Sequence, residues 1–170
     1  MTYAFRGENG TKGGIKGRTP AEVKQAGGFK PWQISSVQGA RDVLKKLAEK
    51  GTLEDEARMW CLSKNKDNGW FFSTGISEGA AYDNYEFLYR MNVSRLAQRK
   101  WSDVGLGATN KVGKMDLYTD APQVSSSEQI AVIWQSSNRT EELLIMTPIS
   151  VSYIELQNAK KAFIPLTKWT

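Results

Sequence analysis

The residues of this chain that could do chemistry are an arginine, two hydroxyls and a glutamate, far apart in the sequence. Arg6 ends the alternating segment TYAFRG, and Ser73 and Thr74 follow three aromatic residues in GWFFSTGIS. Two late apolar runs have an acidic residue before them, Glu128 in SSSEQIAVIW and Glu142 in NRTEELLIM. Taken singly, such residues are commonly surface ion pairs, strand caps or solvated strand ends. Together they are a candidate set for carboxylate, hydroxyl and arginine chemistry.

Two absences narrow the chemistry further. The sequence has no histidine, which removes the commonest acid–base residue, the usual catalytic triads and most zinc sites. The single cysteine, Cys61, allows no internal disulfide and no thiolate metal cluster, and we interpret Cys61 and Trp60 as packing residues. The phosphate-binding motifs GxGxxG and GxxxxGK[ST] do not occur. We therefore expect no metal site and neither hydride nor phosphoryl transfer.

Length and charge limit the classes to which this protein can belong. The chain has 170 residues, which fits a single domain, and 40% of them are hydrophobic, which is enough for a core. Lysine and arginine total 23 against 18 acidic residues, and the net charge of +5 favours anionic partners such as nucleotides, RNA or acidic proteins. No apolar run approaches the roughly 20 residues of a membrane span, and the N-terminus does not resemble a signal peptide. We therefore expect no membrane association.

The pattern of apolar residues predicts an α+β fold with short helices early and antiparallel strands late. TYAFRG alternates as a strand, and TPAEV begins a short helix that Thr19 caps and Gly27–Gly28 ends. Helical spacing continues through VQGARDVLKKLAEKGTLEDEARMWCL, where Gly51 closes the turn. Further strands are predicted for WFF, YEFLYRMNV, EQIAVIW, EELLIM and ISVSYIEL, whereas residues 100–127 have the composition of a loop.

Taken in order, these segments resemble the mono-ADP-ribosyltransferase toxins, particularly the cholera and pertussis toxin group. That family has an aromatic-x-Arg on its first strand, a Ser-Thr-Ser strand, and a Glu-x-Glu or Gln-x-Glu before a late strand. The matching stretches are YAFRG, FFSTG and TEELLIM, and RTPAEVKQAGGFKPW is similar to the family's segment after the arginine strand. The resemblance runs from Tyr3 to about Ile154 and is poor between Asn92 and Gln123. It implies a split antiparallel sheet of the ADP-ribosyltransferase type, in one catalytic domain of residues 1–170.

The resemblance implies a role for each matched residue, with NAD as the co-substrate. Arg6 would bind the NAD phosphates or hold the frame of the site, which suits a guanidinium. Ser73 would hydrogen-bond the catalytic glutamate and fix its rotamer, and Thr74 would support the strand and the nicotinamide pocket. Nicotinamide leaves as a neutral molecule, so the reaction needs a carboxylate near an oxocarbenium-like transition state but no general acid.

Two glutamates compete for the catalytic role. The LLIM after Glu142 fits the family's apolar strand, whereas SSSEQIA around Glu128 resembles the pertussis-type segment. We favour Glu142, because the strand that follows it fits better. Residues i and i+2 of a strand share a face, so the family's second acidic or amide position corresponds to Thr140, or to Ser126 on the alignment with Glu128. Threonine there leaves the acceptor of ADP-ribose open, and Gly75 departs from the last serine of Ser-Thr-Ser.

The resemblance also implies partners and a place of action. Residues 134–140 would form a substrate-recognition loop, in which an exposed Trp134, Arg139 and Thr140 face the target. The expected partners are NAD, a macromolecular acceptor (protein or RNA) in a target cell, and a cognate immunity or delivery partner. A toxin or effector domain of this kind would be secreted or delivered into the cytoplasm of the target cell.

A second interpretation is a non-enzymatic basic module that binds RNA. Tyr85, Phe87 and Tyr89 alternate along one predicted strand and would share a face. Aromatic side chains combined with positive charge are what single-stranded RNA requires of a binding surface. The chain lacks the aromatic motif of the common RNA-binding sheet, so we place this interpretation second.

Overall fold

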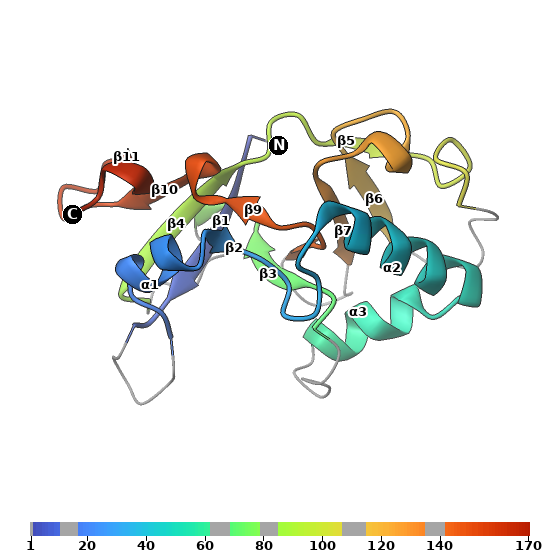
Figure 1. Ribbon diagram of the computed structural model, residues 1–170, viewed down its shortest axis with the longest axis horizontal. Helices are drawn as coiled ribbons and strands as arrows, with labels where there is room; N and C mark the ends of the chain where they lie inside the picture. Colours follow the sequence, from blue (N-terminus) through green and yellow to red (C-terminus); the bar gives the residue numbers. More distant parts are fainter. Residues whose placement is uncertain (1, 11–16, 62–68, 79–84, 107–114, 135–141) are drawn as a thin grey trace. The chain divides into compact units, whose positions relative to one another are not determined.

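A computed structural model describes most of the chain, which clusters into two compact units (Figure 1). The described residues are 2–10, 17–61, 69–78, 85–106, 115–134 and 142–170. Unit 1 is formed by those within Met1–Phe29, Thr74–Ser94 and Ile149–Thr170, and unit 2 by those within Lys30–Ser73 and Arg95–Pro148. That residues 1–170 act as one catalytic domain stays a prediction.

Unit 1 contains an antiparallel sheet made from the beginning, middle and end of the chain. In spatial order, its strands are β11 (Phe163–Pro165), β10 (Ile154–Gln157), β4 (Phe87–Asn92), β1 (Tyr3–Glu8) and the last two residues of β3 (Phe72–Gly75). β1 and β4 pair over six residues, with Arg6 opposite Tyr89, and Gly75 of β3 pairs with Phe5. The predicted strand TYAFRG is therefore confirmed, and Arg6 lies on it with strands on both sides.

Arg90 ties four strands of this sheet together. Its guanidinium on β4 forms an ion pair with Glu155 on β10. The same guanidinium lies over two aromatic rings, 4.1 Å from the centroid of Tyr3 on β1 and 4.3 Å from that of Phe163 on β11. Cation–π contacts of this kind add to the backbone pairing of the strands.

Local signals in the sequence account for α1 (Pro20–Gln25) and the glycines after it. Thr19 caps the helix by accepting a hydrogen bond from the backbone N–H of Glu22 at 3.3 Å, and Pro20 stands in the first turn, as predicted. Gly27 and Gly28 then have φ angles of 82° and 128°. They turn the chain into β2 (Gly28–Phe29), which pairs with β9 (Ile149–Ser150), and α1 contacts β2.

Gly28→Ala is expected to lower the free energy of unfolding by roughly 3 kcal/mol, because of backbone strain and a clash. A Cβ at Gly28 would lie 2.0 Å from the carbonyl oxygen of Ile149, and the backbone of a strand pair cannot yield that far. Gly27→Ala is the matched control: its φ is also positive but its Cβ would meet nothing within 4 Å, so about 1 kcal/mol is expected. Equal urea midpoints for the two variants would contradict this account.

Unit 2 contains a second run of antiparallel strands. β8 (Glu142–Ile145), β7 (Ile130–Trp134), β6 (Asp116–Thr119) and β5 (Ala97–Arg99) pair in that order, and β3 precedes β8 in the strand order. The first two residues of β3, Phe72 and Ser73, belong to this unit. The first four residues of β7 are buried, as expected for a strand whose sequence is a continuous apolar run.

Two helices complete the core of unit 2, α2 (Val37–Lys50) and α3 (Leu53–Cys61). Ser36 caps α2 by accepting from the N–H of Gly39 at 3.0 Å, and Gly51, with φ 70°, ends it in the left-handed region. The buried faces of both helices meet the apolar side chains of the strands in one hydrophobic cluster. The members of this cluster from α2 and α3 are Ala40, Leu44, Leu47, Ala48, Leu53 and Ala57.

The α+β class is confirmed by the antiparallel strands and few helices, while the finer ADP-ribosyltransferase fold stays a proposal. Three expectations need correction. β3 begins at Phe72, so Ser73 and Thr74 lie within the strand and not after it. β6 lies inside residues 100–127, which we expected to be loop, and ISVSYIEL is divided into β9, a 3-10 turn (Val151–Tyr153) and β10. None of the helices in the described ranges is long and apolar enough to cross a bilayer.

Candidate functional site

The C-terminal end of α3 holds the two residues predicted for catalysis in unit 2. Trp60 donates its indole N–H to the hydroxyl oxygen of Ser73 at 2.9 Å. The next residue, Cys61, lies with its Sγ 3.3 Å from Oε2 of Glu142, which accepts its hydrogen bond. Neighbouring Cα atoms are only about 3.8 Å apart, so the two contacts draw Ser73 and Glu142 to the same end of the helix.

Both acceptors stand on strands that the core fixes in place. Ser73 is on β3 and follows two buried residues, Phe71 and Phe72. Glu142 opens β8 and pairs with Trp134, the last residue of β7, while Leu143 beside it is fully buried. Ser73 and Glu142 are themselves half-buried. The arrangement offers a hydroxyl and a carboxylate on rigid elements with access to solvent, as a site for a polar substrate requires.

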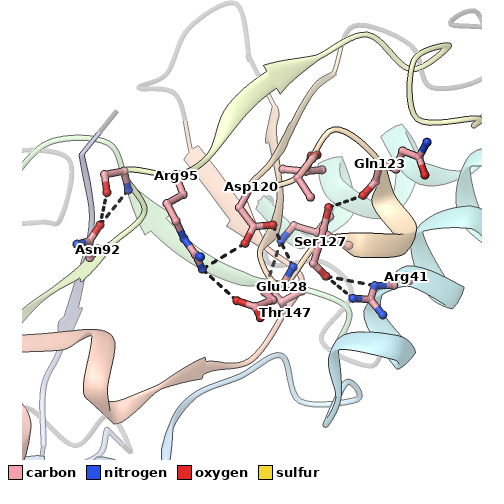
Figure 2. A network of polar contacts seen from close by, with 12 residues as sticks. Arg41, Asn92, Arg95, Asp120, Gln123, Ser127, Glu128 and Thr147 are labelled. Carbon is pink, nitrogen blue, oxygen red and sulfur yellow. Dashed lines mark hydrogen bonds and ion pairs between the residues drawn. The ribbon is translucent and has the colours of Figure 1, made fainter.

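Glu128, the competing glutamate, belongs to a different network (Figure 2). Its carboxylate pairs with Arg95 at 3.0 Å, and its backbone N–H donates to Asp120, which also pairs with Arg95 at 3.4 Å. Glu128 precedes β7 whereas Glu142 is opposite its last residue, so about 20 Å of extended chain separates the two positions. Of the two glutamates, Glu142 is the one that contacts the end of α3, through Cys61.

The network in Figure 2 has the features of a structural brace. Arg41 on α2 donates two hydrogen bonds, at 3.2 and 2.6 Å, to the carbonyl oxygen of Ser127. The hydroxyl of Ser127 in turn donates to the carbonyl of Gln123 at 3.0 Å. These bonds fasten the segment before β7 to α2, while the carboxylate of Glu128 is largely exposed to solvent.

In unit 1, Arg6 belongs to a cluster of two arginines around one carboxylate. Nε of Arg6 and a terminal nitrogen of Arg18 both lie 3.0 Å from Oε1 of Glu8. The backbone N–H of Arg18 donates to the other oxygen of Glu8 at 3.2 Å. Both guanidiniums face the ring of Phe29, at 5.4 Å for Arg6 and 5.0 Å for Arg18. We call Arg6, Glu8, Arg18 and Phe29 the arginine cluster.

The charges of the arginine cluster do not cancel. Burial raises the pKa of the Glu8 carboxyl, but the charges of Arg6 and Arg18 and their hydrogen bonds more than offset it, so the pKa lies below its ordinary value of 4.5. Two guanidiniums and one carboxylate leave one positive charge on side chains that are partly shielded from water. Each guanidinium is oriented by Glu8 and Phe29, which makes the cluster suited to binding an anion such as phosphate.

Glu8→Gln is expected to cost roughly 2 kcal/mol of stability at pH 7, the range for hydrogen bonds to charged groups. The pKa of Glu8 is lowered on folding, so its contribution is present above pH 4.5 and is lost as the pH falls through the lowered pKa. The difference in free energy of unfolding between wild type and variant should therefore shrink in urea titrations run from pH 7 down to pH 3. Glu128→Gln should change the free energy of unfolding little, because the ion pair of Glu128 is exposed. A stability difference between wild type and Glu8→Gln that does not depend on pH would contradict the role given to Glu8.

Tyr89 lies on β4 opposite Arg6, and it is buried, whereas the sequence predicted an exposed aromatic face. Its ring is fully buried and meets Phe29 edge-on, with centroids 5.2 Å apart. Burial raises the pKa of the Tyr89 hydroxyl, and the nearby Glu8 charge adds to this, although Arg18 opposes it. The hydroxyl has no hydrogen-bond partner among the described residues. A buried Tyr89 cannot stack on RNA bases, so Tyr85, Phe87 and Tyr89 do not form the exposed platform that the RNA interpretation needs.

The remaining predicted residues differ in their surroundings. Thr74 is buried, with 4% of its surface exposed, which fits a supporting role in the strand. Trp134, which we expected to be exposed, is half-buried and packs against the core of unit 2, because β7 is central in that sheet. Arg139 and Thr140 lie outside the described residues. Within the described ranges, no three His, Cys, Asp or Glu side chains are grouped as metal ligands would be.

This sequence was compared with family models and with curated proteins. No family model matches this sequence, and neither does any curated protein. A function for the chain therefore depends on the geometry of its side chains and on the motifs in its sequence.

Sequence reasoning missed several residues of the site. Arg18 opens the segment RTPAEV, so its position in the motif was a usable signal, and Glu8 is two residues after Arg6 on the same strand. We interpreted Trp60 and Cys61 as packing residues, yet each donates to a predicted catalytic residue. Their partners are 13 and 81 positions away in the chain, so no local pattern could have indicated these bonds.

Proposed function

We propose that this protein is an NAD-dependent mono-ADP-ribosyltransferase that acts as a toxin or effector domain. The observation that carries the proposal is the pair of contacts at the end of α3, from Trp60 to Ser73 and from Cys61 to Glu142. A hydroxyl and a carboxylate that are far apart in sequence meet one helix end, in the chain order of the resemblance. The resemblance would give Arg6, in the arginine cluster, the third role of that set.

The reaction needs little beyond these groups. A nucleophilic atom of the acceptor bonds to C1′ of the nicotinamide ribose, while the bond from C1′ to the nicotinamide nitrogen breaks. The electron pair of that bond leaves with nicotinamide, which becomes neutral, and the acceptor loses a proton. Positive charge develops on the ribose in the transition state, and the carboxylate of Glu142 would stabilise it. Ser73 would hold that carboxylate in its rotamer.

The other half of NAD is a pyrophosphate, and Arg6 and Arg18 would bind it. Guanidiniums match phosphate oxygens in geometry and in charge. Glu8 contacts and orients both arginines, and their guanidiniums would bind the phosphate oxygens. Thr74, buried in β3, would keep the strand fixed next to Ser73.

The acceptor is a protein or an RNA, since Thr140 takes the position where the resemblance has a second acid or amide. The test is to incubate the purified protein with a cell lysate and NAD carrying a radiolabel in its adenylate part. The label should enter macromolecules, and treating the products separately with protease and nuclease identifies the acceptor class. The proposal is overturned if the wild-type protein neither labels macromolecules nor releases nicotinamide above the level of a Glu142→Gln control.

A further inference from the structure

The strongest feature outside the predicted set is the dipeptide Trp60–Cys61 at the end of α3. The two residues make separate hydrogen bonds to the two groups that the proposed function needs, Ser73 and Glu142. We infer that Trp60 and Cys61 are positioning residues, which fix the orientation of the serine hydroxyl and of the glutamate carboxylate for the reaction. This inference rests on the proposed function.

The helix end is a rigid support for such a task. Leu53 and Ala57 of α3 are fully buried in the core of unit 2. Trp60 packs against the fully buried Phe71, with ring centroids 6.4 Å apart. A donor held by a packed helix and a packed ring restricts its acceptor more than a mobile surface side chain does.

The bond from Trp60 also sets the direction of the Ser73 hydroxyl. An indole nitrogen can only donate, so the oxygen of Ser73 must be the acceptor in this 2.9 Å contact. The single proton of the hydroxyl is then directed away from Trp60. A serine prepared as a donor is what a neighbouring carboxylate needs.

The bond from Cys61 restricts the carboxylate from the other side. A thiol is a weak donor, and a carboxylate accepts from it only while the sulfur keeps its proton. A carboxylate oxygen can only accept, so the thiol of Cys61 is the donor in this contact. Cys61 then holds one oxygen of Glu142, Oε2.

Kinetics of NAD hydrolysis test the inference. Trp60→Phe keeps the aromatic packing and removes the N–H, while Cys61→Ala removes the thiol donor. Each is expected to lower kcat roughly 3- to 10-fold, as the net value of one hydrogen bond implies, with KM for NAD almost unchanged. Cys61→Ser, which keeps a donor, should restore most of kcat. Arg58→Gln is the control on the same helix, since its exposed side chain pairs with Asp55.

A second measurement does not depend on enzyme activity. Cys61 is the single cysteine of the chain, so alkylation by iodoacetamide, followed by mass spectrometry of the intact protein, reports on it alone. Removing the adjacent carboxylate with Glu142→Gln should speed alkylation by roughly threefold or more, because it frees the thiolate from an opposing charge. Arg58→Gln should leave the rate as in wild type.

The outcomes separate the two claims. Turnover that needs Glu142 but is unaffected in Trp60→Phe and Cys61→Ala would overturn the positioning role and leave the proposed function standing. Equal alkylation rates in wild type and Glu142→Gln would overturn the Cys61–Glu142 contact. No NAD turnover, combined with faster alkylation of Glu142→Gln, would support the contact and overturn both the proposed function and the role in positioning.

Discussion

Glu142→Gln is expected to lower kcat for NAD hydrolysis by roughly 100- to 1,000-fold, the usual effect of removing one electrostatic stabiliser of a transition state. Glutamine keeps the size of the side chain and a carbonyl oxygen that can still accept from Cys61. It lacks the negative charge that would stabilise positive charge on the ribose. KM should change little, because NAD in its ground state does not yet carry that charge. The measurement is release of nicotinamide at saturating NAD.

Glu128→Gln is the matched control for this experiment. It is the same substitution at the glutamate that competed in the sequence, and its partner Arg95 is exposed. Its kcat is expected to remain within a factor of about two of wild type, since exposed ion pairs contribute little. If Glu128→Gln were the damaging change and Glu142→Gln the silent one, the assignment of the catalytic glutamate would be reversed.

Arg6→Gln is expected to have the second largest effect, raising KM for NAD roughly tenfold or more, as the loss of a hydrogen bond to a charged group implies. The substitution leaves Glu8 paired with Arg18, so the arginine cluster changes from one net positive charge to none. Arg6→Lys should lie between wild type and Arg6→Gln, because lysine restores the charge but not the planar fork. Initial rates over a range of NAD concentrations measure all three proteins.

Arg95→Gln is the control for the loss of an arginine that pairs with carboxylates. Arg95 forms two ion pairs in unit 2, with Asp120 and Glu128, and is half-exposed. KM for NAD should be unchanged in this variant. Repeating the assay at higher ionic strength should raise KM in wild type more than in Arg6→Gln, because salt screens the attraction between exposed charges. An unchanged KM in Arg6→Gln would contradict a role for Arg6 in phosphate binding.

Local signals predicted the elements with clear ends. The cap at Thr19, the glycines at positions 27 and 28, and the stop at Gly51 each follow from one residue's local preference, and α1 and α2 end at or close to these residues. The strand β6 was missed, because Asp116–Thr119 is short and stands between loop-like segments. Its partner across the sheet is β7, and such pairing over distance leaves no mark in a short window of sequence.

The candidate site was predictable by residue type but not by arrangement. Glu128 and Glu142 look alike in sequence, since each stands before an apolar strand. Their positions along β7 and their contacts distinguish them: Glu142 pairs with Trp134 and accepts from Cys61, whereas Glu128 pairs with Arg95. Tyr89 illustrates the same limit: alternation predicts that Tyr85, Phe87 and Tyr89 share a face, but not that Tyr89 is buried against Phe29 while Tyr85 stays exposed.

The order of strands in unit 1 has a consequence for how the chain folds during synthesis. β1, which carries Arg6, pairs with β4, and β4 in turn pairs with β10 near the other end of the sequence. Contacts so distant in sequence are slow to form and depend on the late segment being present. A nascent chain therefore cannot complete the sheet beneath Arg6 until residues 154–157 have left the ribosome.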